Sequence, residues 1–295
     1  MRRALILTTI VVVGLAVAGI SAQRPRIPPT GAIKHVRDNL YVIPGAGGNT
    51  TVFVTAAGVV LVDTKLANNG EAILNQVRTV SDKPVTTIIN THSHPDHMGS
   101  NNYFPASVEK VSHENARKWI GANAQYASDP AVMPNKTFTD KITLGSGKDR
   151  IDLYYFGAGH TNGDTFVVFP ALRTMHVGDI FAWKALPYVD ADNGGSVIEQ
   201  PKTLAKAIAT VKNVDTIING HTPVSTWNDL KEYAAFTKEF ATFAESEMKA
   251  GKTVDQAAAE YKLNPKYKGY VVSVNPAFGG AKANLQIAYD EMKKK

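Results

Sequence analysis

Apolar residues in the first half of the chain alternate between short β-branched runs and one longer segment with helical spacing. Ile73, Val77 and Val80 recur along one helical face, which predicts a helix over residues 69–80. Apolar runs before and after this segment predict strands, so the three elements form a β-α-β crossover. Earlier runs, separated by glycine-containing stretches, predict a β-meander. The strands predicted in this half cover residues 40–43, 51–54, 59–63 and 85–90.

The second half repeats the alternation of strands and helices. A Gly-Ser-Gly-Lys turn at 145–148 predicts a hairpin between two apolar runs. Ser112 is expected to cap the helix that follows it. A long segment ending near residue 250 carries aromatic residues at helical spacing, which is typical of core packing. The expected strands are 108–111, 138–144, 151–156, 165–169, 173–177 and 216–218, and the expected helices are 113–121, 203–211, 230–250, 254–261 and 278–292.

The beginning of the chain lacks the pattern of a folded domain. Two arginines, an apolar stretch over 4–20 and a small-residue cleavage site follow one another, as in a secretory signal peptide. We therefore expect residues 1–22 to be a signal peptide and the protein to be periplasmic or secreted. An uncleaved apolar stretch acting as an N-terminal membrane anchor is the alternative. Three prolines over 23–33 indicate a linker, so the folded domain is expected over 34–295.

Composition narrows the classes of function. The chain has 295 residues, of which 44% are hydrophobic, enough for one large domain or two ordinary ones. It contains no cysteine, which excludes disulfides, thiol nucleophiles and a lipid attached through cysteine. The formal charge of +6 is spread along the chain, so no nucleic-acid partner is expected. We expect a small-molecule substrate, and the sequence leaves the oligomeric state open.

Three of the eight histidines and one aspartate fall within six residues directly after the strand predicted over 85–90. His92 and His94 alternate, so a strand that feeds a tight loop projects both to one side. Asp96 and His97 then face a neighbouring position. Imidazole and carboxylate ligands together suit zinc, with iron, manganese or nickel as alternatives. A polar surface turn is the other interpretation, and the spacing favours the metal site.

Polar residues recur near the ends of other predicted strands. Asp63 ends an otherwise apolar strand, where a charge needs a partner unless it caps the strand and faces solvent. His160 lies in a glycine-rich loop between two strands, and this position alone leaves ligation and packing equally open. Asp179 and His221 each follow a predicted strand. Open α/β sheets hold their sites at the carboxyl ends of strands, which makes these positions candidates for function.

Three motifs together resemble the metallo-beta-lactamase superfamily: T-H-x-H-x-D-H at 91–97, G-H-T-x-G at 159–163 and V-G-D at 177–179. The resemblance runs from about residue 35 to the C-terminus and implies an α/β fold, the four-layer αβ/βα sandwich, with a metal site at one edge of its two sheets. It also implies two zinc ions, with iron or manganese possible. The first ion would take His92, His94 and His160, the second would take Asp96, His97 and His221, and Asp179 would bridge them as in glyoxalase II-like and lactonase-like hydrolases.

The sequence departs from the family pattern in the loop that carries His160. Relatives often have proline where Ala158 stands and histidine or serine where Asp164 stands. We therefore expect Asp164 to brace the loop instead of touching metal. In the family, an aspartate at the position of Asp63 hydrogen-bonds within the metal-site loop. The remaining histidines, including His35, His113 and His176, are expected to lie outside the site.

The resemblance implies a metallohydrolase in which the ions activate a shared water and Asp96 orients it or relays its proton. The bond cleaved would be an ester, thioester, lactone or amide. A bridging Asp179 favours the ester, thioester or lactone, whereas export favours a β-lactamase. An iron-dependent oxidoreductase and a non-catalytic metal-binding scaffold are further alternatives. Lys184 and Tyr188, in the long loop over 182–196, are candidate substrate contacts.

Overall fold

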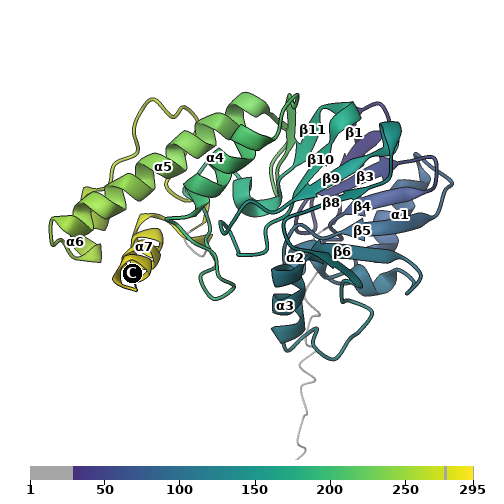
Figure 1. Ribbon diagram of the computed structural model, residues 1–295, viewed down its shortest axis with the longest axis horizontal. Helices are drawn as coiled ribbons and strands as arrows, with labels where there is room; N and C mark the ends of the chain where they lie inside the picture. The colour runs from purple at the N-terminus through teal and green to yellow at the C-terminus, as the bar shows by residue number, and fades with distance from the viewer. Residues whose placement is uncertain (1–28, 276–277, 295) are drawn as a thin grey trace, which may run out of the picture.

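Two mixed β-sheets lie face to face with helices on both outer faces in the computed structural model, which describes residues 29–275 and 278–294 (Figure 1). The predicted signal peptide over 1–22 and the first part of the predicted linker lie outside the described residues. Among the helices of the described ranges, none is long and apolar enough to cross a membrane.

The first sheet has seven strands in chain order. Strands β2 to β4 form the predicted antiparallel meander, and β4 to β7 are parallel. Strand β1, which the sequence pattern did not predict, pairs antiparallel with β2. Helix α1 connects β4 to β5, and its buried Ile73 and Val77 pack on the outer face of the sheet. The elements are β1 (Lys34–Arg37), β2 (Leu40–Ile43), β3 (Thr50–Val54), β4 (Val59–Val62), α1 (Gly70–Arg78), β5 (Val85–Ile89), α2 (Pro95–Met98), η1 (Asn101–Tyr103), β6 (Glu109–His113), α3 (Glu114–Ala122) and β7 (Lys136–Phe138).

The second sheet has six strands in the order β13-β12-β11-β10-β9-β8, and its β11 and β12 are parallel. The C-terminal helices cover its outer face and extend to one side of the sandwich (Figure 1). The elements are β8 (Lys141–Leu144), η2 (Gly147–Asp149), β9 (Ile151–Tyr154), β10 (Phe166–Phe169), η3 (Pro170–Leu172), β11 (Thr174–His176), η4 (Gly178–Phe181), α4 (Gln200–Thr210), β12 (Thr216–Ile218), β13 (Ser225–Thr226), α5 (Trp227–Lys249), α6 (Val254–Glu260) and α7 (Ala281–Lys293).

The central core lies between the two sheets. Phe53 of β3 and Phe169 of β10 meet edge to face with ring centroids 5.1 Å apart. Val62 and Ile89 from the first sheet join the same buried cluster as Ile218 from the second. Separate apolar clusters lie between each sheet and its helices. Helices, sheet, sheet and helices therefore form the predicted four-layer αβ/βα sandwich.

The strand predicted over 138–144 is wrong, because the chain changes sheets within it. β7 ends at Phe138 in the first sheet, and β8 begins at Lys141 in the second. The two residues between them carry the chain across the sandwich. The predicted hairpin around residues 145–148 is confirmed, because β8 and β9 pair as antiparallel strands.

The predicted cap of α3 is also wrong by one residue. The Nδ1 atom of His113, not the Ser112 hydroxyl, accepts a hydrogen bond from the backbone N–H of Asn115 at 3.3 Å. His113 is buried and its ring stacks on Tyr155 with centroids 3.9 Å apart. This histidine therefore has a structural role at the start of the helix.

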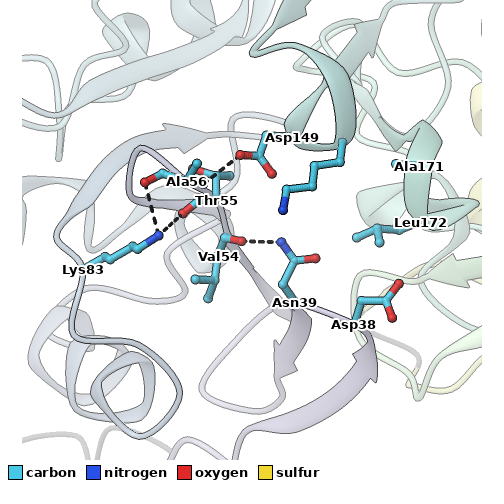
Figure 2. Close-up of a pocket in the computed structure, with 10 residues that line it drawn as sticks. Asp38, Asn39, Val54, Thr55, Ala56, Lys83, Asp149, Ala171 and Leu172 are labelled. Carbon is cyan, nitrogen blue, oxygen red and sulfur yellow. Dashed lines mark hydrogen bonds between the residues drawn. The ribbon is translucent and has the colours of Figure 1, made fainter.

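A cavity of about 700 Å³ opens at the edge of the sandwich where β4, β5 and β11 begin (Figure 2). The turn between β3 and β4 lines it. The Asp149 carboxylate accepts from the backbone N–H of Ala56 at 2.7 Å, and Lys83 donates to the carbonyl of Thr55 at 2.7 Å. These charged groups therefore serve the turn, at the opposite edge from the strand-end candidates.

Lys65 is fully buried beside the loop over 44–48. Its ammonium donates to the carbonyl oxygens of Ile43 and Gly45, each at 2.7 Å, and of Gly48 at 2.9 Å. The three donors of the ammonium match these three acceptors, so Lys65 fixes the loop. Gly48 lies against the ring of His97, so a Cβ atom on residue 48 would collide with that ring. Lys65 thereby helps to form one wall around His97.

Replacing this lysine should destabilise the fold. Lys65→Met leaves three carbonyls without their donor, which should lower the free energy of unfolding by about 3 kcal/mol. Burial lowers the pKa of Lys65 from 10.5 to about 7, so the unfolded chain binds one more proton between these pH values. Wild-type stability therefore rises with pH in this window, and the deficit of the variant should grow. Urea unfolding at several pH values measures both effects.

Lys83→Met is the matched control. The exposed Lys83 also donates to backbone carbonyls, those of Thr55 at 2.7 Å and Ala56 at 3.2 Å. Its replacement should change the free energy of unfolding by less than about 1 kcal/mol. Equal losses in the two variants would contradict the role assigned to Lys65.

Candidate metal centre

The strand-end candidates meet at one edge of the sandwich. The carboxyl ends of the parallel strands β4 and β5 lie there, as do those of β11 and β12. His92 and His94 follow β5. Asp179 follows β11 in η4, and His221 follows β12. His160 comes from the loop between β9 and β10.

The short helix α2 sets the direction of two further side chains. His94 is its N-cap with an extended ψ of 143°, and Pro95 begins the helix. Asp96 and His97 therefore lie in its first turn, next to the loop that carries His92. His97 is fully buried, and Asp96 is partly exposed.

The seven predicted residues converge in two clusters. Within each cluster, the atoms able to bind a metal lie within 4.8 Å of one another. Asp179, which belongs to one cluster, also approaches the other. Its Oδ2 atom lies 3.0 Å from His221 Nε2 and its Oδ1 atom 3.3 Å from His97 Nε2. The same Oδ2 atom is 3.9 Å from His160 Nε2. The first cluster consists of His92, His94, His160 and Asp179, and the second of Asp96, His97 and His221.

Two of the histidines are oriented by carboxylates outside the clusters. The Nδ1 atom of His97 lies 2.7 Å from Asp63 Oδ2, and the Nε2 atom of His94 lies 2.7 Å from Asp190 Oδ2. An ionised carboxylate only accepts hydrogen bonds, so each of these ring nitrogens carries a proton and donates it. In the neutral imidazole, the other nitrogen is then unprotonated and faces its cluster.

His160 and His92 are oriented by neutral oxygen atoms. His160 Nδ1 donates to the carbonyl of Tyr188 at 2.7 Å. The Thr91 hydroxyl gives its proton to Asp63 Oδ2 at 2.7 Å, so it accepts from His92 Nδ1 at 2.9 Å. Both Nε2 atoms are therefore unprotonated. The Nε2 atom of His92 is buried and has no hydrogen-bond partner among the described residues.

Unprotonated imidazole nitrogens thus face one another across a space that also holds carboxylate oxygens. His94 Nδ1 lies 2.9 Å from His160 Nε2. Asp179 Oδ1 is buried without a hydrogen-bond partner in the part of the chain that the structure describes. Facing lone pairs repel one another unless a proton or a cation lies between them. Imidazole nitrogen and carboxylate oxygen are ligands of zinc, iron and manganese, so the donor set fits a divalent cation.

The first cluster favours neutral imidazoles. Burial, together with the neighbouring His97, lowers the pKa of His92 well below its usual value. Burial and the neighbouring His94 lower the pKa of His160 to about 4. These two side chains are therefore free of a competing proton at neutral pH, which is the form that binds a metal.

The second cluster has the opposite electrostatics. Burial disfavours the charged form of His97, but Asp179 and Asp96 outweigh it and raise the pKa of His97 well above its usual value. Asp179 likewise raises the pKa of His221 against the effect of burial. These carboxylates attract positive charge to the cluster, and a divalent cation supplies it in place of the protons.

Two further carboxylates have the roles predicted for them. Asp63 is fully buried and accepts from the backbone N–H of Thr91 at 2.8 Å, so it is no solvent-facing cap. Asp164 accepts from the hydroxyl of Thr161 at 2.7 Å and from its backbone N–H at 3.0 Å. Asp164 therefore braces the loop that carries His160.

The other candidates lie outside the clusters. His35 is exposed and contacts a backbone carbonyl three residues further on. His176 is buried in β11, where its Nδ1 atom lies 3.0 Å from a threonine hydroxyl of β3. Lys184 pairs with Asp229 at 2.7 Å instead of facing the clusters. The Tyr188 ring does lie beside the first cluster, next to His94 and His160.

Asp190 is a residue of the site that the sequence did not single out. Besides its contact with His94, its backbone N–H donates to the carbonyl of His160 at 2.9 Å. It thus ties the loop over 182–196 to two of the three histidines of the first cluster, His94 and His160. Asp192, two residues further on, is exposed. No pattern in the sequence distinguishes these two aspartates.

The sequence profile of the metallo-beta-lactamase superfamily matches residues 43–221, a range that contains all seven clustered residues. The chain belongs to this superfamily. Metallo-beta-lactamase type 2 of Elizabethkingia meningoseptica is 28% identical over 178 residues, which cover 57% of this chain and 69% of that protein. Metallo-beta-lactamase IND-1 of Chryseobacterium indologenes is 22% identical over 198 residues, which cover 66% of this chain and 80% of that protein.

A solved structure aligns with a larger share of this chain than the sequence profile does. The stereoselective inverting sec-alkylsulfatase Pisa1 from Pseudomonas sp. aligns with 88% of this chain at a TM-score of 0.75 and 16% identity. This chain spans 50% of the length of the sulfatase chain. At this identity the likeness shows the fold. The protein is a metallohydrolase of the metallo-beta-lactamase superfamily, and its His and Asp clusters imply a divalent metal, typically zinc.

We predict that Asp190 strengthens metal binding although it touches no metal. In Asp190→Asn the partner of His94 loses its charge, so zinc affinity should fall about 10- to 100-fold while the fold is kept. Competition with a chromogenic chelator measures the affinity. Asp192→Asn removes the exposed carboxylate of the same loop and should leave zinc affinity unchanged. Wild-type affinity in Asp190→Asn would contradict the assigned role.

Proposed function

We propose that the protein is a dinuclear zinc hydrolase that cleaves an ester, thioester, lactone or amide bond in a small molecule. The position of Asp179 carries this proposal. Its two oxygens approach His97 at 3.3 Å and His221 at 3.0 Å in the second cluster, while it also belongs to the first. A carboxylate between two sets of imidazoles suits a bridge between two cations.

Each proposed ligand set combines local and distant residues. Both sets draw on the motif over 91–97 and are completed by a histidine from the second half of the chain. Asp179 supplies the shared carboxylate. The first ion would be held by His92, His94 and His160, and the second by Asp96, His97 and His221.

Zinc ions held by these residues would polarise the scissile group and lower the pKa of a bound water toward about 7. Asp96 is the proposed proton acceptor. Its Oδ2 atom lies 3.3 Å from His221 Nε2, and its side chain is 29% exposed, so it borders both the cluster and solvent. Asp63 and Asp190 hold the protons of their histidines outside the site, so the imidazoles need no reorientation during the reaction.

The proposed order of substrates places esters, thioesters and lactones before β-lactams. A bridging carboxylate shares its negative charge with both cations and moderates their Lewis acidity. This favours esters, thioesters and lactones over β-lactams. β-Lactam hydrolysis is the second candidate, because two relatives of this chain are metallo-beta-lactamases by name. No observation on the described residues favours an iron-dependent oxidoreductase or a non-catalytic scaffold.

We also propose that the protein is exported, with a signal peptide over 1–22, a linker over 23–33 and the hydrolase domain over 34–295. The basic, apolar and small-residue pattern of the first segment supports this. N-terminal sequencing of protein from the periplasm or medium should find Gln23 at or near the start. Intact Met1 on soluble cytoplasmic protein would refute the proposal.

The substrate order is tested with the purified, zinc-loaded protein. The panel consists of p-nitrophenyl acetate, a γ-lactone, a glutathione thioester, nitrocefin and a penicillin. We expect higher kcat/KM for at least one of the first three than for the β-lactams. A penicillin value above about 10⁵ M⁻¹s⁻¹, with ester and lactone values about a hundredfold lower, would reverse the order.

The bridging role is tested by Asp179→Asn. Loss of the shared charge should remove about one of two zinc equivalents and lower kcat/KM about 100-fold or more. Zinc is counted by mass spectrometry of dialysed protein. Asp152→Asn, which changes another buried carboxylate that binds Arg150, is the control and should keep both zinc equivalents. Full zinc content and turnover in Asp179→Asn would show that Asp179 is a bystander.

A further inference from the structure

Two aromatic rings lie beside the histidine clusters. The Tyr188 ring lies 5.9 Å from the ring of His94 and 5.5 Å from that of His160, centroid to centroid. The Trp183 ring lies 5.7 Å from the ring of His221. Both residues belong to the loop that follows η4, so this loop places one aromatic side chain beside each cluster.

A third ring, from the C-terminal part of the chain, joins these two. Phe278 lies 6.0 Å from Trp183 and 6.1 Å from Tyr188, again between ring centroids. The three residues Trp183, Tyr188 and Phe278 are called the aromatic shelf below. Phe278 is 45% exposed, although a phenylalanine gains most when it is buried. The shelf therefore presents apolar surface to solvent directly beside the clusters.

Residues before and after Phe278 in the chain contact the loop that carries Trp183 and Tyr188. Before Phe278, the backbone N–H of Val271 donates to the carbonyl of Lys184 at 3.0 Å, in an isolated bridge between strands. After it, the side-chain amide of Asn284 donates to the carbonyl of Pro187 at 2.9 Å. Both contacts join described residues on either side of Phe278 to the loop of Trp183 and Tyr188.

Among the described residues, the loop of Trp183 and Tyr188 contains one lysine, which is paired and so is not free to select an anionic group. This lysine, Lys184, pairs with Asp229 at 2.7 Å and lies 5.6 Å from the centroid of the Tyr270 ring. What the shelf offers a ligand is therefore aromatic surface. Apolar and planar groups are the ones that gain from stacking on such surface.

We infer that the aromatic shelf binds the apolar part of the substrate, a medium-length alkyl chain adjacent to the scissile bond. This inference rests on the proposed function, because it assigns the clusters to the bond that is cleaved. Phe278 is its specificity-determining residue. It lies outside residues 43–221, the range matched by the superfamily profile, so this selectivity is a property of the C-terminal segment.

The test compares p-nitrophenyl acetate with p-nitrophenyl octanoate, which share a leaving group and differ in acyl length. Wild-type enzyme should have the higher kcat/KM for octanoate. Phe278→Ala should lower that value about tenfold through KM, equivalent to about 1.4 kcal/mol, and change the acetate ester less than twofold. Phe278→Tyr keeps a ring and should retain the preference. Val274→Ala, at a 49% exposed residue of the same segment, is the matched control and should behave as wild type.

A binding measurement separates this inference from the proposed function. Calorimetry with the zinc-loaded protein compares octanoate and acetate as free carboxylates, without turnover. Octanoate should bind more tightly than acetate, and Phe278→Ala should lower the ratio of the two affinities about tenfold. If neither ester is hydrolysed but octanoate binding depends on Phe278, the proposed function fails and the shelf stands. If esters are hydrolysed without a chain-length preference, or Phe278→Ala matches wild type in both assays, the shelf is overturned.

Discussion

The site depends on imidazole protons being held away from its centre. Four histidines each have one ring nitrogen committed to an oxygen of Asp63, Thr91, Asp190 or Tyr188. Each partner is itself fixed by the fold. The remaining nitrogens face one another at distances as short as 2.9 Å, an arrangement that favours a cation over an empty space. A metal bound by these nitrogens would also stabilise the folded state, because the ligand set exists only in the folded chain.

The sandwich explains how residues so distant in the chain reach one centre. In each sheet, two neighbouring parallel strands end at the same edge, and the loops after them carry the clustered side chains. The packing between the sheets brings these two edges together. The loop over 182–196 then closes the first cluster through Asp190 and carries two rings of the aromatic shelf. The same loop therefore links the geometry of the metal site to the apolar surface beside it.

Some of this arrangement could be predicted from the sequence because it is encoded locally. The alternation of His92 and His94 and the turn that begins at Pro95 are short-range features. The order of strands and helices fits the four-layer fold that the family resemblance implies. Asp190 reaches His94 across 96 positions from a loop without periodicity, so spacing does not reveal it. Lysine is normally exposed, and Lys65 is buried because three carbonyls of a neighbouring loop accept from it. Its contacts exist only in the folded chain.

The proposed function requires two cations among the seven clustered side chains. A crystal structure of the zinc-loaded protein, with anomalous diffraction recorded on both sides of the zinc absorption edge, tests it most directly. The account predicts two anomalous peaks, one bounded by His92, His94 and His160 and the other by Asp96, His97 and His221, with Asp179 between them. A single peak, or peaks away from these residues, would contradict it.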